Sequence, residues 1–159
     1  MLQRLKSYTL EEAKRAAERY CAYQERCHKD VQEKLRSMGM IPLAIDEILG
    51  HLIQHKFLDE SRFARLYAGG KFRIKKWGRN RIKLELKQRG LNERLIKLGL
   101  KEIPDQDYLK VFDELAHKRN NQLATETDKY KRRKKLADYL IYRGWESHLV
   151  FEKTQELVP

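Results

Sequence analysis

Residues 57–91 read FLDESRFARLYAGGKFRIKKWGRNRIKLELKQRGL, and this stretch decides the fold. Asp59, with an acid and a serine directly after it, is a signal for the start of a helix. Phe63, Leu66 and Tyr67 follow at spacings of three and four residues. This spacing places them on one face of a helix, which we expect to run to about residue 74.

A glycine pair at 69–70 is expected to end or kink this first helix. A second helix is predicted after it, with Ile82 and Leu86 facing inward and Gly90 closing it. Between the helices lies a basic corner around Trp77. An amphipathic Trp usually keeps its ring in the core, so we expect Trp77 to be half-buried and Gly78 to permit a close turn.

The same pattern occurs three times along the chain, in register with three glycines. Gly39, Gly90 and Gly144 are separated by 51 and 54 residues. Apolar residues recur at four positions relative to each glycine: eight and four residues before it, and one and five residues after it, where the first copy has an alanine at the last position. The residues eight positions before are Val31, Ile82 and Leu136, and those four positions before are Leu35, Leu86 and Leu140. The repeat predicts a unit of helix, basic corner, helix, glycine stop and helix.

The fold class is therefore predicted to be all-α, with three tandem three-helix repeats forming an elongated, curved rod. Thr9 with Glu12, Pro42 and Asn92 supply further helix-start signals. We expect units over residues 1–58, 59–104 (basic) and 105–159. A polar connector over about 119–128 is expected to be longer than its counterparts.

The charge distribution concentrates the expected function in the middle unit. The net charge is +12, and residues 58–104 alone carry 14 basic and 5 acidic side chains, a net +9. A localised basic field suits a polyanion or an acidic protein surface. The competing interpretation is a solvated, highly charged helical surface.

Two basic segments are the candidate binding residues. Arg79, Lys83 and Lys87 recur every four residues, opposite Ile82 and Leu86, and the cluster 129–135 has six basic residues in seven. The predicted partner or nucleic-acid contacts are Arg73, Lys75, Lys76, Arg79, Arg81, Lys83, Lys87, Arg89, Lys131, Arg132, Arg133 and Lys134. Acids are nearly absent from both stripes, which favours binding over mere solvation.

Other residue types give weaker signals. No phosphate-binding glycine loop and no nucleophile context are recognisable, so we expect no catalytic site, cofactor or metal. His51 and His55 are interpreted as a solvent-facing row and Cys21 as a core residue. Tyr20, Tyr23 and Tyr67 are spaced like core residues. We expect no segment of the chain to span a membrane. Its two cysteines do not suggest a disulfide framework, which favours a location in the reducing cytoplasm.

The stretches 57–67 and 75–91 resemble the signature of the RecX family of bacterial regulators of the recombinase RecA. The residues that fit the family pattern are Leu58, Asp59, Glu60, Phe63, Ala64, Tyr67, Trp77, Gly78, Arg81, Ile82, Leu86 and Gly90. Residues 20–35 look like the family's opening repeat, whereas the third unit is similar only in its pattern.

The resemblance implies a non-catalytic helical protein that binds RecA filaments on single-stranded DNA and inhibits recombinase and co-protease activity in DNA repair. A monomer is expected, with weak direct nucleic-acid contact. Two alternatives stay open: a direct, non-specific nucleic-acid-binding helical module, and a scaffold for other acidic proteins.

Overall fold

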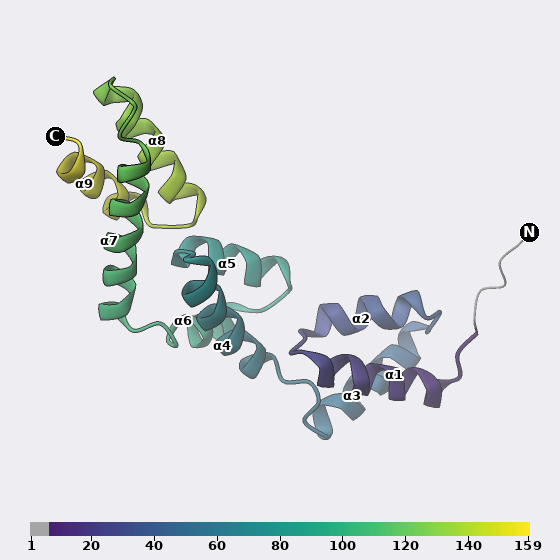
Figure 1. Cartoon of the computed structure of the whole chain (residues 1–159). Coiled ribbons are helices and arrows are strands. Elements are labelled where there is room, and N and C mark those ends of the chain that lie inside the picture. The colour runs from purple at the N-terminus through teal and green to yellow at the C-terminus, as the bar shows by residue number, and fades with distance from the viewer. Residues whose placement is uncertain (1–6) are drawn as a thin grey trace, which may run out of the picture.

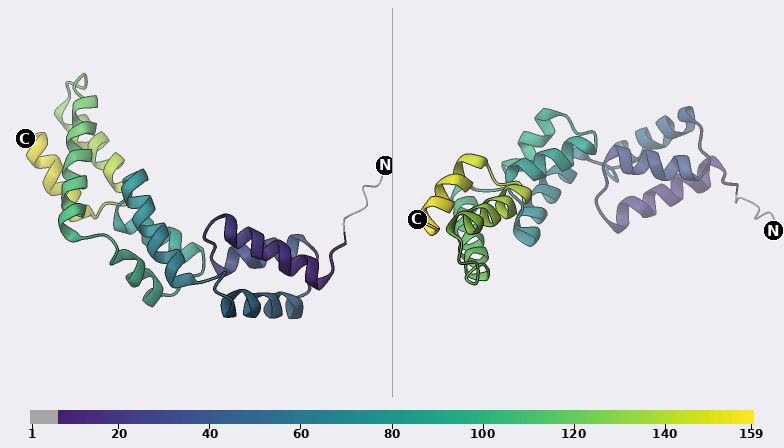
Figure 2. Two further views of the ribbon diagram at one scale, coloured as in Figure 1. Left: turned by 60° about the horizontal axis from the view of Figure 1, so that its bottom comes forward. Right: turned by 90° about the horizontal axis from the view of Figure 1, so that it is seen from above.

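The computed structural model describes residues 7–159, and every regular element in that range is helical. Three groups of three helices follow one another along an elongated, bent rod (Figures 1 and 2). The bounds are α1 Leu10–Tyr23, α2 His28–Ser37, α3 Pro42–Gln54, α4 Glu60–Gly70, α5 Arg79–Gln88, α6 Glu93–Leu100, α7 Asp105–Gln122, α8 Lys129–Tyr142 and α9 Ser147–Leu157. The predicted fold class is confirmed. The exact division at residues 58 and 104 stays a prediction, and residues 1–6 of the first expected unit lie outside the described residues.

The helix starts follow the predicted caps. Thr9 accepts the Glu12 backbone N–H at 3.1 Å, while the Glu12 carboxylate accepts that of Thr9 at 3.2 Å. The Asp59 carboxylate caps α4, the Asn92 side chain caps α6, and Pro42 opens α3. Each cap satisfies N–H groups that the helix itself leaves unpaired.

The three register glycines end their helices in the same way. Gly39, Gly90 and Gly144 have φ values of +80°, +82° and +96°, a left-handed conformation that glycine adopts without steric cost. In each copy the glycine N–H and the next N–H donate to the carbonyls three and four positions before the glycine, at 2.9–3.2 Å. This is the Schellman arrangement, in which the apolar residues at the two ends of the motif also pack together. The apolar register found in the sequence therefore encodes the helix stop itself.

The apolar core falls into two clusters rather than three. The first holds α1–α3 and includes Val31, Leu35 and Leu52, all fully buried. The second is continuous from the central helices α4–α6 into α7–α9, and it includes Ile82 and Leu140. A unit of about 50 residues has little core of its own, so shared burial stabilises the second and third units together.

The junction between these two units is made by backbone groups. Gly78 N–H donates to the Arg143 carbonyl at 2.8 Å, Asn80 N–H donates to the Gly144 carbonyl at 2.9 Å, and the Trp145 indole donates to the Lys76 carbonyl at 3.2 Å. A Cβ added to Gly78 would overlap the backbone of Gly144 and Trp145. The expectation that Gly78 serves a close turn is wrong: its φ of −78° suits any residue, and glycine is required by the approach of the third unit.

The glycine pair at 69–70 ends α4 as an α-helix, and a π-helical turn, η1 (Lys71–Lys75), continues the helical path directly after it. Three further expectations are corrected. The connector spans 123–128 rather than 119–128, since α7 extends to Gln122, although it is longer than its counterparts over 24–27 and 76–78, as expected. Leu66 and Tyr23 were expected to face the core, but they are 54% and 84% exposed. Spacing of three and four residues defines a broad stripe on a helix, and it could not tell that Leu66 and Tyr23 lie on the part of that stripe that stays exposed.

The two cysteines are buried, Cys21 in the N-terminal core and Cys27 against the central core. Burial raises the pKa of both thiols to about 11. We therefore expect native protein at pH 8 to react slowly with a thiol reagent, and protein in denaturant to react at once, because the thiolate is the nucleophile. The unfolded thiols ionise near their ordinary pKa of about 8.5. The free energy of unfolding should thus fall as the pH rises from about 9 to 11, since the unfolded chain loses protons first. Fast labelling of the native protein would contradict this assignment.

Candidate functional site

Four lysines, on α5, on α6 and at the C-cap of α6, form an open basic surface of the central unit. Lys83 and Lys87 lie one turn apart on α5, and Lys97 and Lys101 lie four apart at the end of α6. All four are exposed, and none forms an ion pair with a carboxylate of the described residues. We call these four residues the cationic face.

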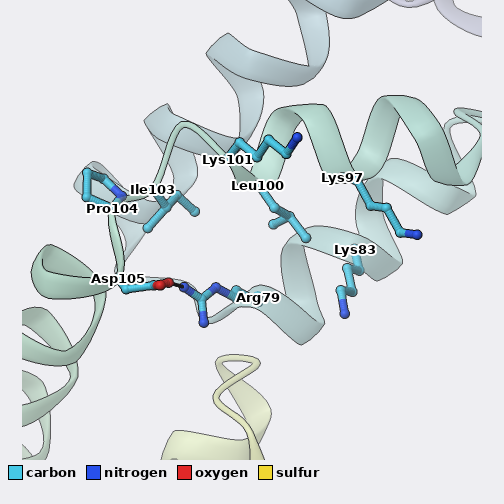
Figure 3. Close-up of a pocket in the computed structure, with 8 residues that line it drawn as sticks. All are labelled: Arg79, Lys83, Lys97, Leu100, Lys101, Ile103, Pro104 and Asp105. Carbon is cyan, nitrogen blue, oxygen red and sulfur yellow. Dashed lines mark hydrogen bonds and ion pairs between the residues drawn. The ribbon is translucent and has the colours of Figure 1, made fainter.

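A shallow hollow of about 540 Å³ lies along this face (Figure 3). Lys83, Lys97 and Lys101 line it together with Arg79, and Asp105 is the one carboxylate in the lining. Like charges held this close raise the local positive potential, which favours a bound anion. Lys97 and Lys101 were missed in the sequence, although their spacing of four residues on a short helix was a usable signal.

Arg79 is less available than its sequence position indicated. Its guanidinium lies 3.8 Å from the ring centroid of Tyr108 and forms ion pairs with Asp105 at 2.5 Å and Glu146 at 3.8 Å. The Tyr108 hydroxyl accepts the Arg79 backbone N–H at 3.0 Å and donates to the Glu146 carboxylate. Burial and the Glu146 carboxylate raise the pKa of Tyr108. Arg79 therefore acts first as a tie between the central and third units.

Arg81 and Arg89 are also held by neighbours. Arg81 lies 4.3 Å from the Trp77 ring centroid and 4.9 Å from that of Tyr142, and Trp77 itself is half-buried, as predicted. Arg89 pairs with Glu85 at 3.1 Å and stacks on Tyr67. By contrast, the predicted contacts Arg73, Lys75 and Lys76 are exposed and form no ion pair within residues 7–159.

The second basic cluster is largely engaged within the third unit. Arg132 donates to Asn120 at 3.0 Å, Arg133 donates to the Val158 carbonyl at 2.6 Å, and Lys134 pairs with Asp138 at 2.7 Å. Lys135 pairs with Glu126 at 2.7 Å and, with a backbone N–H, lowers the pKa of that carboxyl. Lys131 alone of the four predicted contacts in this cluster has an open, unpaired side chain. The near-absence of acids within the stripe was thus misleading, because an amide, a backbone carbonyl and the nearby acids Glu126 and Asp138 engage it instead.

Two other expectations concern metal binding and membrane-spanning segments. No group of three or more His, Cys, Asp or Glu in the described part of the chain could hold a metal ion. His55 is exposed, whereas His51 is half-buried with Nε2 at 3.3 Å from Glu18 Oε2. No helix within residues 7–159 has the length and apolar character needed to cross a membrane.

Comparisons with known proteins converge on one family. Residues 59–100 match the family model described as RecX, second three-helix domain, and residues 105–153 match RecX, third three-helix domain. "Regulatory protein RecX" of Clostridium acetobutylicum is 34% identical over 132 residues, which cover 81% of this chain and 61% of that protein. The protein of the same name from Serratia proteamaculans is 33% identical over 105 residues, covering 65% of this chain and 60% of that one. The matches thus span about three fifths of each relative's length.

A solved structure shares the architecture as well. The crystal structure of RecX from Lactobacillus salivarius superposes with a TM-score of 0.80 at 25% sequence identity, covering 93% of this chain and 96% of that chain. The relatives carry a regulatory name, and the shared fold extends over nearly the whole rod.

Proposed function

This chain belongs to the RecX family, and we propose on that basis that it is a negative regulator of RecA that binds the recombinase filament on single-stranded DNA. The observation that carries the proposal is the cationic face, four exposed lysines without ion pairs, three of which line one hollow in the central unit of a curved rod. A helical filament of protein and DNA presents a long anionic groove. A rod with a localised basic surface can follow such a groove without a deep pocket of its own.

In this proposal the chain acts as a monomer, and its contacts are to acidic protein surface, DNA phosphate or both. The lysines of the cationic face suit phosphates and carboxylates as point charges but do not read base edges, which favours contact without sequence preference. Arg73, Lys75 and Lys76 extend the proposed contact surface onto η1, and Lys131 onto α8. The remaining predicted residues are engaged in contacts within the protein and are not part of the proposed contact surface: Arg79, Arg81, Arg89, Arg132, Arg133 and Lys134.

The test is a titration of the protein into strand-exchange and DNA-dependent ATPase reactions of the cognate RecA. We expect inhibition of both reactions at protein-to-RecA ratios near or below one, together with co-sedimentation on the filament. Absence of both inhibition and filament binding would overturn the proposal. Filter binding without RecA is the companion measurement: tight, sequence-dependent binding to DNA alone would instead favour a direct nucleic-acid-binding module.

A further inference from the structure

A second basic cleft lies where the central and third units meet, away from the cationic face. It is formed by η1 on one side and by α7 and α8 on the other, and it encloses about 340 Å³. Five cations line it and no carboxylate does: Lys75, Lys76, Lys118, Arg119 and Arg143. None of the five lies within ion-pair distance of an acid among the described residues, so their charges are not neutralised by the fold.

The two arginines of this junction cleft are positioned around one aromatic ring. The guanidinium carbons of Arg119 and Arg143 lie 4.9 and 5.0 Å from the ring centroid of Tyr139. Arg143 is fixed further by a hydrogen bond of 2.5 Å to the Lys75 carbonyl. Stacking on a tyrosine holds a guanidinium plane in place while leaving its edge free for hydrogen bonds. The stacking therefore holds both guanidinium groups at the wall of the cleft.

Arg119 has a buried hydrogen-bond donor without an acceptor among the described residues. Its Nε–H is shielded from solvent and has no partner among the described residues, and its Nη1 makes one long hydrogen bond of 3.3 Å to Gln122. Buried donors are nearly always paired in folded proteins, so an unpaired one calls for an explanation. A small rotation of the side chain would present the Nε–Nη edge to an oxyanion, the bidentate geometry in which guanidinium binds phosphate.

We propose that the junction cleft is a binding site for a phosphate group with more than one negative charge. Two guanidinium forks and three ammonium groups supply only donors, which matches a group whose oxygens only accept. Small-molecule sites start at about 300 Å³, so the cleft has room for a phosphate or pyrophosphate group and little more. Because its walls come from two units, the bound anion would link η1 to α7 and α8. The site goes beyond the proposed regulatory function and does not require the recombinase.

The experiment is calorimetric titration of the full chain with pyrophosphate in 0.15 M NaCl, alongside Arg119→Gln, Arg119→Lys and the control Lys110→Gln. Lys110 is exposed on the same helix, outside the cleft, and its substitution removes the same charge. We expect one saturable site in the wild type, affinity lower by about tenfold or more in Arg119→Gln, an intermediate decrease in Arg119→Lys and no decrease in Lys110→Gln. Circular dichroism checks that each variant is folded.

Absence of saturable binding, or an equal decrease in Lys110→Gln, would overturn the proposal, because the second result would reflect net charge alone. Competition identifies the source of the phosphate. Displacement of pyrophosphate by a 5′-phosphorylated oligothymidylate, and not by the same strand with a 5′-hydroxyl, would assign the site to a strand end. Displacement by inorganic phosphate but by neither strand would assign it to a free ion. Failure of this site leaves the RecA proposal standing, since the four lysines of the cationic face are not part of the cleft. Lys75 and Lys76 alone belong both to the cleft and to the wider contact surface proposed for RecA.

Discussion

Gly144→Ala is expected to destabilise the central and third units by about 3 kcal/mol or more, combining a left-handed backbone with steric overlap. Gly144 has a φ of +96°, which strains any residue with a Cβ. That Cβ would also overlap the backbone and Cβ of Arg81, where α5 passes the helix stop. The steric overlap acts on the contact that joins the two units, so it cannot relax without separating them. Urea unfolding followed by tryptophan fluorescence measures this change, because both Trp77 and Trp145 lie at the junction.

Gly90→Ala is the matched control for this prediction. Gly90 has nearly the same backbone, φ +82°, and ends the equivalent helix, but a Cβ there would meet nothing within 4 Å. It should therefore show the conformational cost alone, about 1–2 kcal/mol. Equal destabilisation by the two substitutions would show that the close approach of Gly144 to α5 adds nothing to stability.

The comparison of these glycines also shows what the sequence could reveal. The helix stops were predictable because each depends on residues within six positions of one another, and the apolar pair of each Schellman motif leaves a visible pattern. The pairing of Gly78 with Gly144 was not predictable. It joins residues 66 positions apart, and the local signal at Gly78, a glycine after Trp77, was equally compatible with a turn.

The candidate site divides along the same line. Lys83 and Lys87 were correctly expected to be exposed, because the position of a side chain opposite Ile82 and Leu86 follows from helical geometry. The engagement of Arg79 with Asp105 and Glu146 depends on a helix and a loop of the next unit. A guanidinium can serve a structural ion pair as well as a ligand, so residue type and spacing could not decide between the two roles.

Reversal of two charges on the cationic face, Lys83→Glu with Lys87→Glu, is expected to weaken binding to the RecA–single-stranded DNA filament by about a hundredfold at low salt. Both lysines are exposed and free of ion pairs, so the change removes two attractive charges and adds two repulsive ones. The dependence of affinity on salt should flatten, by about one unit of log–log slope for each DNA phosphate that the protein no longer neutralises. Fluorescence anisotropy of labelled filaments at several salt concentrations gives both quantities.

The control is a second double reversal, Arg19→Glu with Arg36→Glu, in the N-terminal unit. Arg36 stands three residues before Gly39, as Lys87 stands three before Gly90, and both arginines are exposed. The two variants carry the same net charge and a similar penalty at a helix C-terminus. An equal decrease of affinity in both would reduce the effect to overall charge, and unchanged affinity in the lysine variant would show that the cationic face is merely solvated.

The variant Lys83→Glu with Lys87→Glu leaves Arg79 unchanged, although Arg79 lies on the same stripe of α5. Its guanidinium joins Asp105, Glu146 and the ring of Tyr108, so Arg79→Glu would place three carboxylates together and loosen the junction as well. Weaker filament binding by that variant could arise from a bent or opened rod rather than from the absence of a charge that binds the filament. We therefore expect Arg79→Glu to lower both unfolding stability and filament affinity, whereas the lysine reversal should lower affinity at nearly wild-type stability. Urea unfolding and the anisotropy titration are therefore measured on both variants. A decrease of affinity alone indicates residues that bind the filament, and a decrease of both affinity and stability indicates a residue that maintains the binding surface.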